Sequence, residues 1–533
     1  MAFRRRAARR RIPPLLVLVV LALTTWYLVL PPESPVVLAL HFNAWRVRHA
    51  LGLEGMASWT EDGGGGQGRG GGGGGKYPVH IPSEVGCLIK TGYGTRHRVR
   101  EQLRAFAVQG GLLGDEGRDF LVVGDWAYKR GGSKPDGRHE RRSSKQDGQG
   151  QEAEQEKEPQ KETDKDLGVE QIHDVVGLVM DSDMGRAWAE HDRFGKYRSL
   201  RGAVDAGDEA KAEHLGRKYG WELDALKFIK GMDMAYRRMP HKKWYMILDD
   251  DTFVVRSSLQ ALLRTLDPAR PAYLGNSVGD YRARFAHGGS AVLVSGAAMK
   301  MLFAGGRPDL VSEAYARSLD ETWGDRLVAT TLQRLGVYIA EPYSSFFNGE
   351  TPAQTRIRPE RACLPIVSFH GLREPGAMLA LGEALRRTSR DDDDDDDDSS
   401  SDHDRTHKKD DKPLLWGQLW DLFAQHPLHT YAAQQPPFRP GDHVGPGHDD
   451  DPDMTTWKAV HSADHCRRKC TARSACLAWS FHPHTRECRT SPWVIAGPAE
   501  AEADTSTAAA GTTSAVLSGV NWATAKSILR ECR

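Results

Sequence analysis

The chain of 533 residues has little cysteine, little asparagine and no excess of charge of either sign. Lys plus Arg and Asp plus Glu both number 72, so the composition gives no indication of a nucleic-acid partner. Asn43, Asn276, Asn348 and Asn521 all lie outside Asn-x-Ser/Thr sequences, so N-glycosylation of the chain is not expected. The length exceeds that of one ordinary domain and predicts several.

The seven cysteines are few for this length, but five of them lie close together: Cys466, Cys470, Cys476, Cys488 and Cys532. Such clustering predicts a small module that is stapled by disulfides in an oxidising compartment. Zinc binding is the alternative interpretation of the same cluster. Because the total is odd, at least one thiol is unpaired or paired with another chain.

The amino end predicts a membrane anchor. Six arginines between residues 4 and 11 precede the uncharged run of 16 residues from Leu15 to Leu30. Positive charge before the span predicts a cytosolic tail over 1–12, a signal anchor over 13–31 and a lumenal remainder. The short span suits the Golgi membrane, in a single-pass type II arrangement. A cleaved signal peptide is the alternative, which Trp26, Tyr27 and the missing small-residue cleavage pattern disfavour.

Changes in composition predict the remaining boundaries. A stem over 32–76 ends in a glycine-rich, flexible tract, and a folded domain follows over 77–385. The charged insertion 129–168 is expected to be disordered. A linker over 386–453 contains the acidic run 391–398, for which calcium binding is the alternative, and a short helix near Trp416. The cysteine-rich module occupies 454–533.

Apolar, β-branched runs alternate with helical patterns through the folded domain, which predicts an α/β sheet covered on both faces. In the strand expected from Trp244 to Val255, three carboxylates interrupt the apolar sequence: Asp249, Asp250 and Asp251. Adjacent carboxylates in a core would repel each other, whereas at the carboxyl end of a central strand they can hold a divalent cation. The alternative is an exposed acidic turn that begins the next helix at Ser257.

Six segments, taken in order, resemble the Fringe-like β-1,3-glycosyltransferases, the group that includes core-1 galactosyltransferase, and especially their fungal members. They are Ile89–Gly92, Gly220–Lys227, Lys243–Thr252, Phe285–Ser290, Trp323–Arg326 and Ser368–Gly371. The resemblance implies a GT-A type fold, a nucleotide-sugar-binding sheet with flanking helices. It also implies a UDP-sugar donor, usually Mn²⁺, and inversion at the anomeric carbon. The default reaction is transfer of galactose or N-acetylglucosamine in β-1,3 linkage to a glycan or glycoprotein acceptor.

Residue by residue, the resemblance implies that Asp249, Asp251 and His370 hold the metal. It makes Asp325 the catalytic base that takes the proton of the acceptor hydroxyl. A carboxylate that merely favours a helix start is the other interpretation of Asp325, and Asp320 and Glu321 are close enough to compete for the role. The expected contacts to nucleotide and sugar are Lys90, Thr91, Gly92, Asp249, Asp250, Gly288 and Gly289.

One departure from the family pattern favours a different function. The usual doublet of two acids is broken because Gly324 precedes Asp325. The alternative is therefore a catalytically inactive, membrane-tethered protein that binds glycans or proteins.

The cysteine-rich module, with Cys476–Phe481 and the late Ser518-Gly519, resembles PAN/Apple modules. The resemblance implies a small α+β domain, a short sheet against one helix, that grips glycans or proteins such as the acceptor. It also implies the nested pairs Cys466–Cys488 and Cys470–Cys476. Cys532 has no obvious partner inside the module, and Cys87 or Cys363 could serve.

Overall fold

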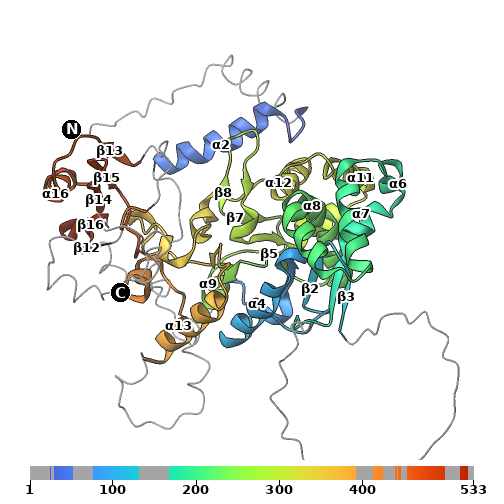
Figure 1. Ribbon diagram of the computed structural model, residues 1–533. Coiled ribbons are helices and arrows are strands. Elements are labelled where there is room, and N and C mark those ends of the chain that lie inside the picture. Colours follow the sequence, from blue (N-terminus) through green and yellow to red (C-terminus); the bar gives the residue numbers. More distant parts are fainter. Residues whose placement is uncertain are drawn as a thin grey trace, which may run out of the picture.

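The computed structural model describes residues 25, 29–51, 76–130, 167–391, 412–423, 439–440, 442–445, 453–497 and 516–525. They form an α/β domain around a seven-stranded sheet and a smaller domain around a five-stranded sheet (Figure 1). Most of the expected anchor and insertion, the acidic run 392–398, the glycine-rich tract and Cys532 lie outside the described residues. Within the described ranges, no helix combines the length and apolar character needed to cross a membrane.

The central sheet has the strand order β3-β4-β2-β1-β5-β10-β7. Its middle strands β4, β2, β1 and β5 are parallel, whereas β10 runs antiparallel to both β5 and β7, and β3 antiparallel to β4. The bounds are β1 (Val85–Lys90), β2 (Phe120–Gly124), β3 (Tyr128–Lys129), β4 (Gln171–Asp174), β5 (Trp244–Asp249), β7 (Tyr273–Gly275) and β10 (Val292–Ser295). Burial on both faces explains the nearly continuous apolar sequence of β1, β2, β5 and β10.

Helices cover both faces of this sheet, as the sequence predicted. Leu88 and Ile247 point to a core formed with α8 (Glu209–Arg238), α10 (Gly296–Phe303) and α12 (Gly324–Gln333). The alternate residues Ile89 and Leu248 point to a core formed with α4 (His97–Val108) and α9 (Arg256–Leu263). The architecture is therefore a mixed α/β sheet with a mostly parallel centre.

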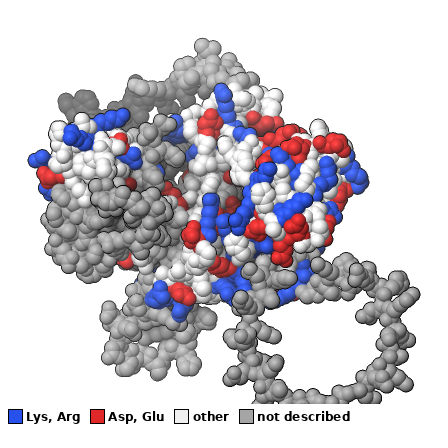
Figure 2. Space-filling view, viewed as in Figure 1, with Lys and Arg blue, Asp and Glu red and all other residues white. Residues whose placement is uncertain are grey.

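The domain contains further helices, two small sheets and several 3₁₀ turns. The helices are α3 (Ile81–Glu84), α5 (Val175–Met180), α6 (Asp183–Ala187), α7 (Asp192–Asp205), α11 (Pro308–Arg317), α13 (Ala377–Asp391) and α14 (Leu419–Phe423). Two-stranded sheets join β6 (Phe253–Val254) to β11 (Ser368–Phe369) and β8 (Ser277–Val278) to β9 (Phe285–Ala286). The 3₁₀ turns are η1 (Tyr93–Thr95), η2 (Gly288–Ser290), η3 (Glu341–Phe346), η4 (Pro352–Gln354), η5 (Pro359–Arg361) and η7 (Trp416–Gln418). Positive and negative side chains alternate over the region of α6, α7 and α11 (Figure 2).

The expected stem contains a helix, α2 (Pro35–Ala50), which packs against the α/β domain. The Tyr338 hydroxyl donates a hydrogen bond of 2.9 Å to the carbonyl of Pro32, and the rings of Tyr338 and His41 stack at 3.9 Å. Val37 and Leu38 are buried. Together with neighbouring side chains of the domain, α2 lines a cavity of about 580 Å³.

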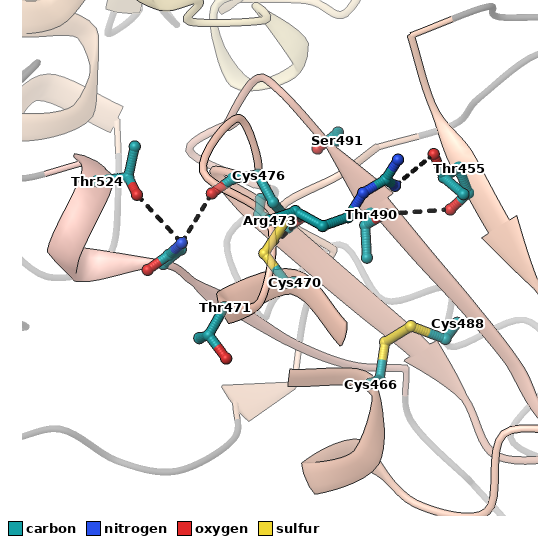
Figure 3. Close-up of a disulfide and its surroundings, with 12 residues drawn as sticks. Thr455, Cys466, Cys470, Thr471, Arg473, Cys476, Cys488, Thr490, Ser491 and Thr524 are labelled. Atoms are coloured by element: carbon teal, nitrogen blue, oxygen red, sulfur yellow. Dashed lines mark hydrogen bonds between the residues drawn. A yellow bond between two sulfur atoms is a disulfide. The ribbon is translucent and has the colours of Figure 1, made fainter. Parts of the chain in front are cut away.

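The small domain has the strand order β12-β16-β14-β15-β13, with α16 (Ala463–Thr471) against the sheet. Its strands are β12 (Arg439–Pro440), β13 (Thr455–Trp457), β14 (Ala478–His482), β15 (Glu487–Ser491) and β16 (Leu517–Val520). Disulfides join Cys466 to Cys488 and Cys470 to Cys476, so both predicted pairs are present (Figure 3). Of the two partners considered for Cys532, Cys363 takes part in a disulfide, whereas Cys87 is a buried free thiol.

The two domains share one apolar core. Leu477, Ala478 and Val494 of the small domain belong to the same cluster of buried residues as α4 and α9. Ile357 and Val494 exchange two backbone hydrogen bonds of 2.9 and 3.0 Å. Because these contacts exclude water from both sides, we expect the small domain to stabilise the α/β domain.

The structure also differs from the sequence-based expectations. The apolar run 337–340 predicts a strand, but the structure has only a single bridge there, between Tyr273 and Ile339. The apolar periodicity of residues 221–239 predicts a helix, but α8 is longer and begins at Glu209, where the Asp208 side chain accepts a hydrogen bond from the Lys211 amide. Its first turns are polar and partly exposed, so they lack the apolar periodicity on which the prediction depended.

Candidate functional site

The candidate site lies where β1 and β5 end. These neighbouring parallel strands are in a register that pairs Lys90 with Asp249, each the last residue of its strand. The Lys90 Nζ atom lies 2.8 Å from a carboxylate oxygen of Asp249. Parallel strands bring their carboxyl ends to one edge of the sheet, so the two strands deliver these side chains to the same place.

A second strand pair brings His370 to the same edge. β11 is antiparallel to β6 and pairs Phe369 with Phe253, so the residue after β11 reaches the turn that precedes β6. The His370 Nε2 atom consequently lies 3.3 Å from Asp251 Oδ1. The amide of Leu372 donates a hydrogen bond of 3.2 Å to the carbonyl of Asp251 and fixes this approach.

Asp249, Asp251 and His370 each offer a ligand atom, and these atoms all lie within 4.8 Å of one another. Two carboxylates and an imidazole are a donor set that suits Mn²⁺ or a similar divalent cation. Glycine is required opposite this set, because a Cβ at Gly289 would lie 2.2 Å from His370 Nε2. The residues therefore fit the cation that the sequence predicted.

Charge stabilises Asp251 in its ionised form. Burial disfavours the charge, but hydrogen bonds from His370 and from Arg373, the latter 2.9 Å long, outweigh it. The pKa of the Asp251 carboxyl is therefore well below its usual range. The pKa of His370 is raised in turn, because hydrogen bonding to Asp251 exceeds the opposing effect of burial.

Asp250 is buried and is not one of the three grouped ligands; its Oδ1 atom lies 3.4 Å from Arg98, which also lies 3.9 Å from Asp251. The Oδ2 atom of Asp250 accepts hydrogen bonds from the hydroxyls of Thr91 and Thr95, at 2.7 and 2.5 Å. Burial raises the pKa of Asp250 to about 6, although these hydrogen bonds partly offset it. This geometry makes Asp250 and Thr91 an internal brace between β1 and the acidic turn.

Lys90 is a buried cation that positions the acidic turn. Besides Asp249 it contacts Asp224 of α8 at 3.0 Å, and its Nζ atom lies 3.4 Å from the centre of the Phe228 ring. Burial opposes its charge, but the attraction of the two carboxylates is greater, so the pKa of Lys90 is raised. Gly92 lies close to a second buried pair, Lys227–Asp125, whose Nζ–Oδ2 distance is 3.0 Å.

Asp325 lies beside the glycine turn that also faces His370. The amide of Gly288 donates a hydrogen bond of 2.7 Å to one of its carboxylate oxygens, and the amide of Arg326 donates one of 2.8 Å to the other. Burial raises the pKa of Asp325 despite these two bonds. Consecutive residues, Gly288 and Gly289, thus contact the expected base and an expected metal ligand.

The competing acids are arranged differently. The Asp320 side chain is 82% exposed and lies 3.3 Å from His191. Glu321 forms an ion pair of 2.6 Å with Arg326. Packing explains why residue 324 is a glycine, because a Cβ there would lie 2.2 Å from the Phe228 ring that supports Lys90. An acid at that position would displace this ring, so the broken doublet follows from local packing.

Sequence reasoning missed several residues that build the site. Gln102 of α4 donates hydrogen bonds to the carbonyls of Asp249 and Thr252, at 2.8 and 2.7 Å. These bonds hold the acidic turn against α4. The His287 ring lies edge-on to His370 with centroids 5.2 Å apart, and burial lowers the pKa of His287. His287 could have been found within the segment Phe285–Ser290, whereas nothing in the local sequence marks Gln102.

Comparison with family models gives two matches. Residues 207–347 match the model described as Fringe-like, and residues 447–510 match the model described as the PAN domain. No curated protein matches the chain. The chain therefore combines a Fringe-like region with a carboxyl-terminal PAN domain, as its motifs predicted. The Fringe-like match supports a glycosyltransferase in general, and the PAN domain supports protein or carbohydrate binding.

Proposed function

We propose that the protein is a metal-dependent, inverting glycosyltransferase that moves galactose or N-acetylglucosamine from a UDP-sugar to a glycan or glycoprotein acceptor. β-1,3 linkage is part of this proposal. The observation that carries it is the convergence of Asp249, Asp251 and His370 within 4.8 Å at the end of the central strands. Asp325 lies next to this group across the Gly288-Gly289 turn.

Asp249, Asp251 and His370 would hold the divalent cation, which would neutralise charge on the departing nucleoside diphosphate. Lys90 holds the Asp249 side chain in place through an ion pair of 2.8 Å. The buried brace of Thr91 and Asp250 fixes the acidic turn against β1. The absence of a side chain at Gly288 and Gly289 lets their turn pack against Asp325 and His370, so any contact that they make with the sugar comes from their backbone.

Asp325 would act as the general base. Both of its oxygens are oriented by backbone amides, so the carboxylate can accept a proton without a change of rotamer. The acceptor oxygen forms a bond to the anomeric carbon as the bond to the diphosphate breaks, and the hydroxyl proton passes to Asp325. The raised pKa of Asp325 makes it a stronger base than an exposed aspartate.

Location belongs to the same proposal: a single-pass type II protein of the Golgi membrane with a lumenal catalytic domain. The arginines before Leu15 and the two disulfides of the PAN domain support it. Protease treatment of sealed microsomes tests this orientation. We expect a carboxyl-terminal tag to survive until detergent is added, and its digestion in sealed vesicles would contradict the proposal.

Hydrolysis and transfer assays test the activity. The purified full-length chain, in detergent, is incubated with a panel of UDP-sugars with Mn²⁺ or with EDTA. We expect release of UDP from one donor in Mn²⁺ and none in EDTA. The alternative, an inactive glycan- or protein-binding protein, rested on Gly324, whose packing against Phe228 accounts for the missing acid. Binding of a UDP-sugar without any turnover across donors and acceptors would favour that alternative.

A further inference from the structure

The outer face of α2 exposes several aliphatic side chains, with the exposed Asn43 between Leu40 and Val47. Val36, Leu40, Val47 and Leu51 are 40, 50, 56 and 64% exposed. Their spacing of four, seven and four residues places them on one side of a helix with 3.6 residues per turn. A helix that packs on a domain and faces water on its other side would present polar residues to the water. The apolar residues of this stripe therefore indicate that something covers them.

The stripe is unusual for this molecule. Nine large apolar side chains are exposed among the described residues, and five of them lie between Val29 and Leu51. The others are dispersed over distant elements: Leu178, Trp188, Trp221 and Trp323. Single exposed apolar residues are ordinary on a protein surface, whereas a row of them along one helix marks a contact surface.

The opposite face of α2 is fixed to the α/β domain. Besides the contacts of Pro32 and His41 with Tyr338, the Arg284 guanidinium lies 5.5 Å from the centre of the Phe42 ring. Arg334 lies 3.9 Å from Glu33 just before the helix. Figure 1 shows α2 along the outside of the domain, above β7 and β8. Whatever covers the stripe therefore also orients the domain.

We propose that the membrane surface covers this stripe, so that α2 lies in the bilayer interface and holds the catalytic domain at a fixed orientation to the membrane. The chain itself supplies the reason. The uncharged run expected as the anchor ends at Leu30, and α2 begins only five residues later, at Pro35. Five residues span at most about 18 Å, so an anchored chain keeps the start of α2 close to the bilayer.

The chemistry of the stripe suits this partner. Aliphatic side chains on one face, with the charged Arg46 at its flank, are typical of helices that lie in an interface with the apolar face among the acyl chains. The inference depends on the expected anchor, but it does not depend on catalysis. It predicts that the first part of the expected stem over 32–76 is a helix docked on the domain and held close to the anchor.

Site-specific photocrosslinking in the full-length chain tests the inference. A benzophenone amino acid replaces Leu40 or Val47, and the chain is reconstituted in phosphatidylcholine vesicles that carry a radiolabelled lipid. Trp188 is the matched control, because it is also apolar and 50% exposed but follows α6, away from α2 in Figure 1. We expect labelled lipid on the chain at Leu40 and Val47 and none at Trp188.

Each other outcome overturns the inference. A covalent dimer from Leu40 or Val47 would show that a second copy of the chain covers the stripe. Absence of any adduct would show that the stripe faces water, and equal lipid labelling at Trp188 would show unspecific adsorption. A UDP-sugar hydrolysis assay on the same preparations keeps this result separate from the proposed activity, because substitutions on the outer face of α2 do not touch the candidate site.

Discussion

The α/β domain and the PAN domain bury different kinds of polar side chain. Nine lysines, aspartates and glutamates are buried in the described residues, and all belong to the α/β domain. The described part of the PAN domain buries neutral groups such as Ser480, Thr490 and Asn521, and two disulfides cross its core. The α/β domain therefore contains charged side chains in its interior, whereas the described interior of the PAN domain contains neutral polar groups and disulfides.

The difference indicates where chemistry takes place. A buried charge disfavours folding unless it is paired, so its presence asks for a reason beyond stability. Five of the nine gather around the ends of β1, β2 and β5: Lys90, Asp125, Lys227, Asp250 and Asp251. Disulfides, by contrast, stabilise a small domain without preparing any group for reaction. The comparison predicts that substitutions in the first domain change activity and substitutions in the second change stability.

The largest effect is expected from Asp251→Ala. It removes a carboxylate from the expected metal site, so sugar transfer should fall to background, and added Mn²⁺ should not restore it. Asp233→Asn is the control, because Asp233 is an equally buried carboxylate that accepts hydrogen bonds from Arg237 and Tyr315 away from the site. We expect that control to retain its turnover per folded molecule. Full activity of Asp251→Ala would remove the metal assignment.

The next largest effect is expected from Asp325→Asn. The amide has the same size and can still accept the hydrogen bond from the Gly288 amide, but its NH2 group cannot accept the one from Arg326, so stability should fall by about 1 kcal/mol. It cannot take the acceptor proton, and kcat should fall by about 10²–10⁴-fold. Binding of the UDP-sugar, measured by calorimetry, should persist. Asp320→Asn and Glu321→Gln are matched controls, and a larger loss in either would transfer the role of base to that residue.

The sequence predicted the residues of the expected metal site better than the residues that hold them in position. Three adjacent aspartates within an apolar run are visible in one line of sequence, and the ends of parallel strands meet by rule, so the acidic turn could be placed. His370 could be placed only through the family resemblance, because its approach depends on the pairing of β6 with β11, more than 110 residues apart. Pairing between such distant short strands leaves no local periodicity.

Gln102 and α2 escaped prediction for different physical reasons. A buried glutamine on α4 occupies a position where a helix pattern expects an apolar residue, and its purpose appears only with the carbonyls of Asp249 and Thr252 beside it. Polar and apolar residues are mixed on every side of α2, since His41, Asn43, Arg46 and Arg48 are spread around it, so its pattern does not separate a docked face from an outer face. In both cases the role of the segment depends on the distant residues that it contacts and not on its local sequence.

A moderate effect on stability is expected from the disulfides. Replacing Cys466 and Cys488 by Ser opens a link across 22 residues and should lower the local unfolding free energy by about 3 kcal/mol. Replacing Cys470 and Cys476, which are 6 residues apart, should lower it by about 2 kcal/mol. Hydrogen exchange of the β14 and β15 amides measures both. Transfer to a small soluble acceptor should be unchanged. A parallel loss of kcat would contradict the prediction that substitutions in the PAN domain change stability alone.

The smallest effect concerns the docking of α2 at acidic pH. Burial against Tyr338 lowers the pKa of His41 from its ordinary value of about 6.5, so the docked helix holds a neutral imidazole. The undocked state then binds more protons than the docked state, and the stability of docking falls as the pH drops below about 6.5. Hydrogen exchange of the α2 amides should accelerate slightly between pH 7.5 and 5.5. In His41→Phe, which keeps a ring for stacking but cannot take a proton, this change with pH should disappear. An unchanged pH response in that variant would show that His41 is not the group responsible.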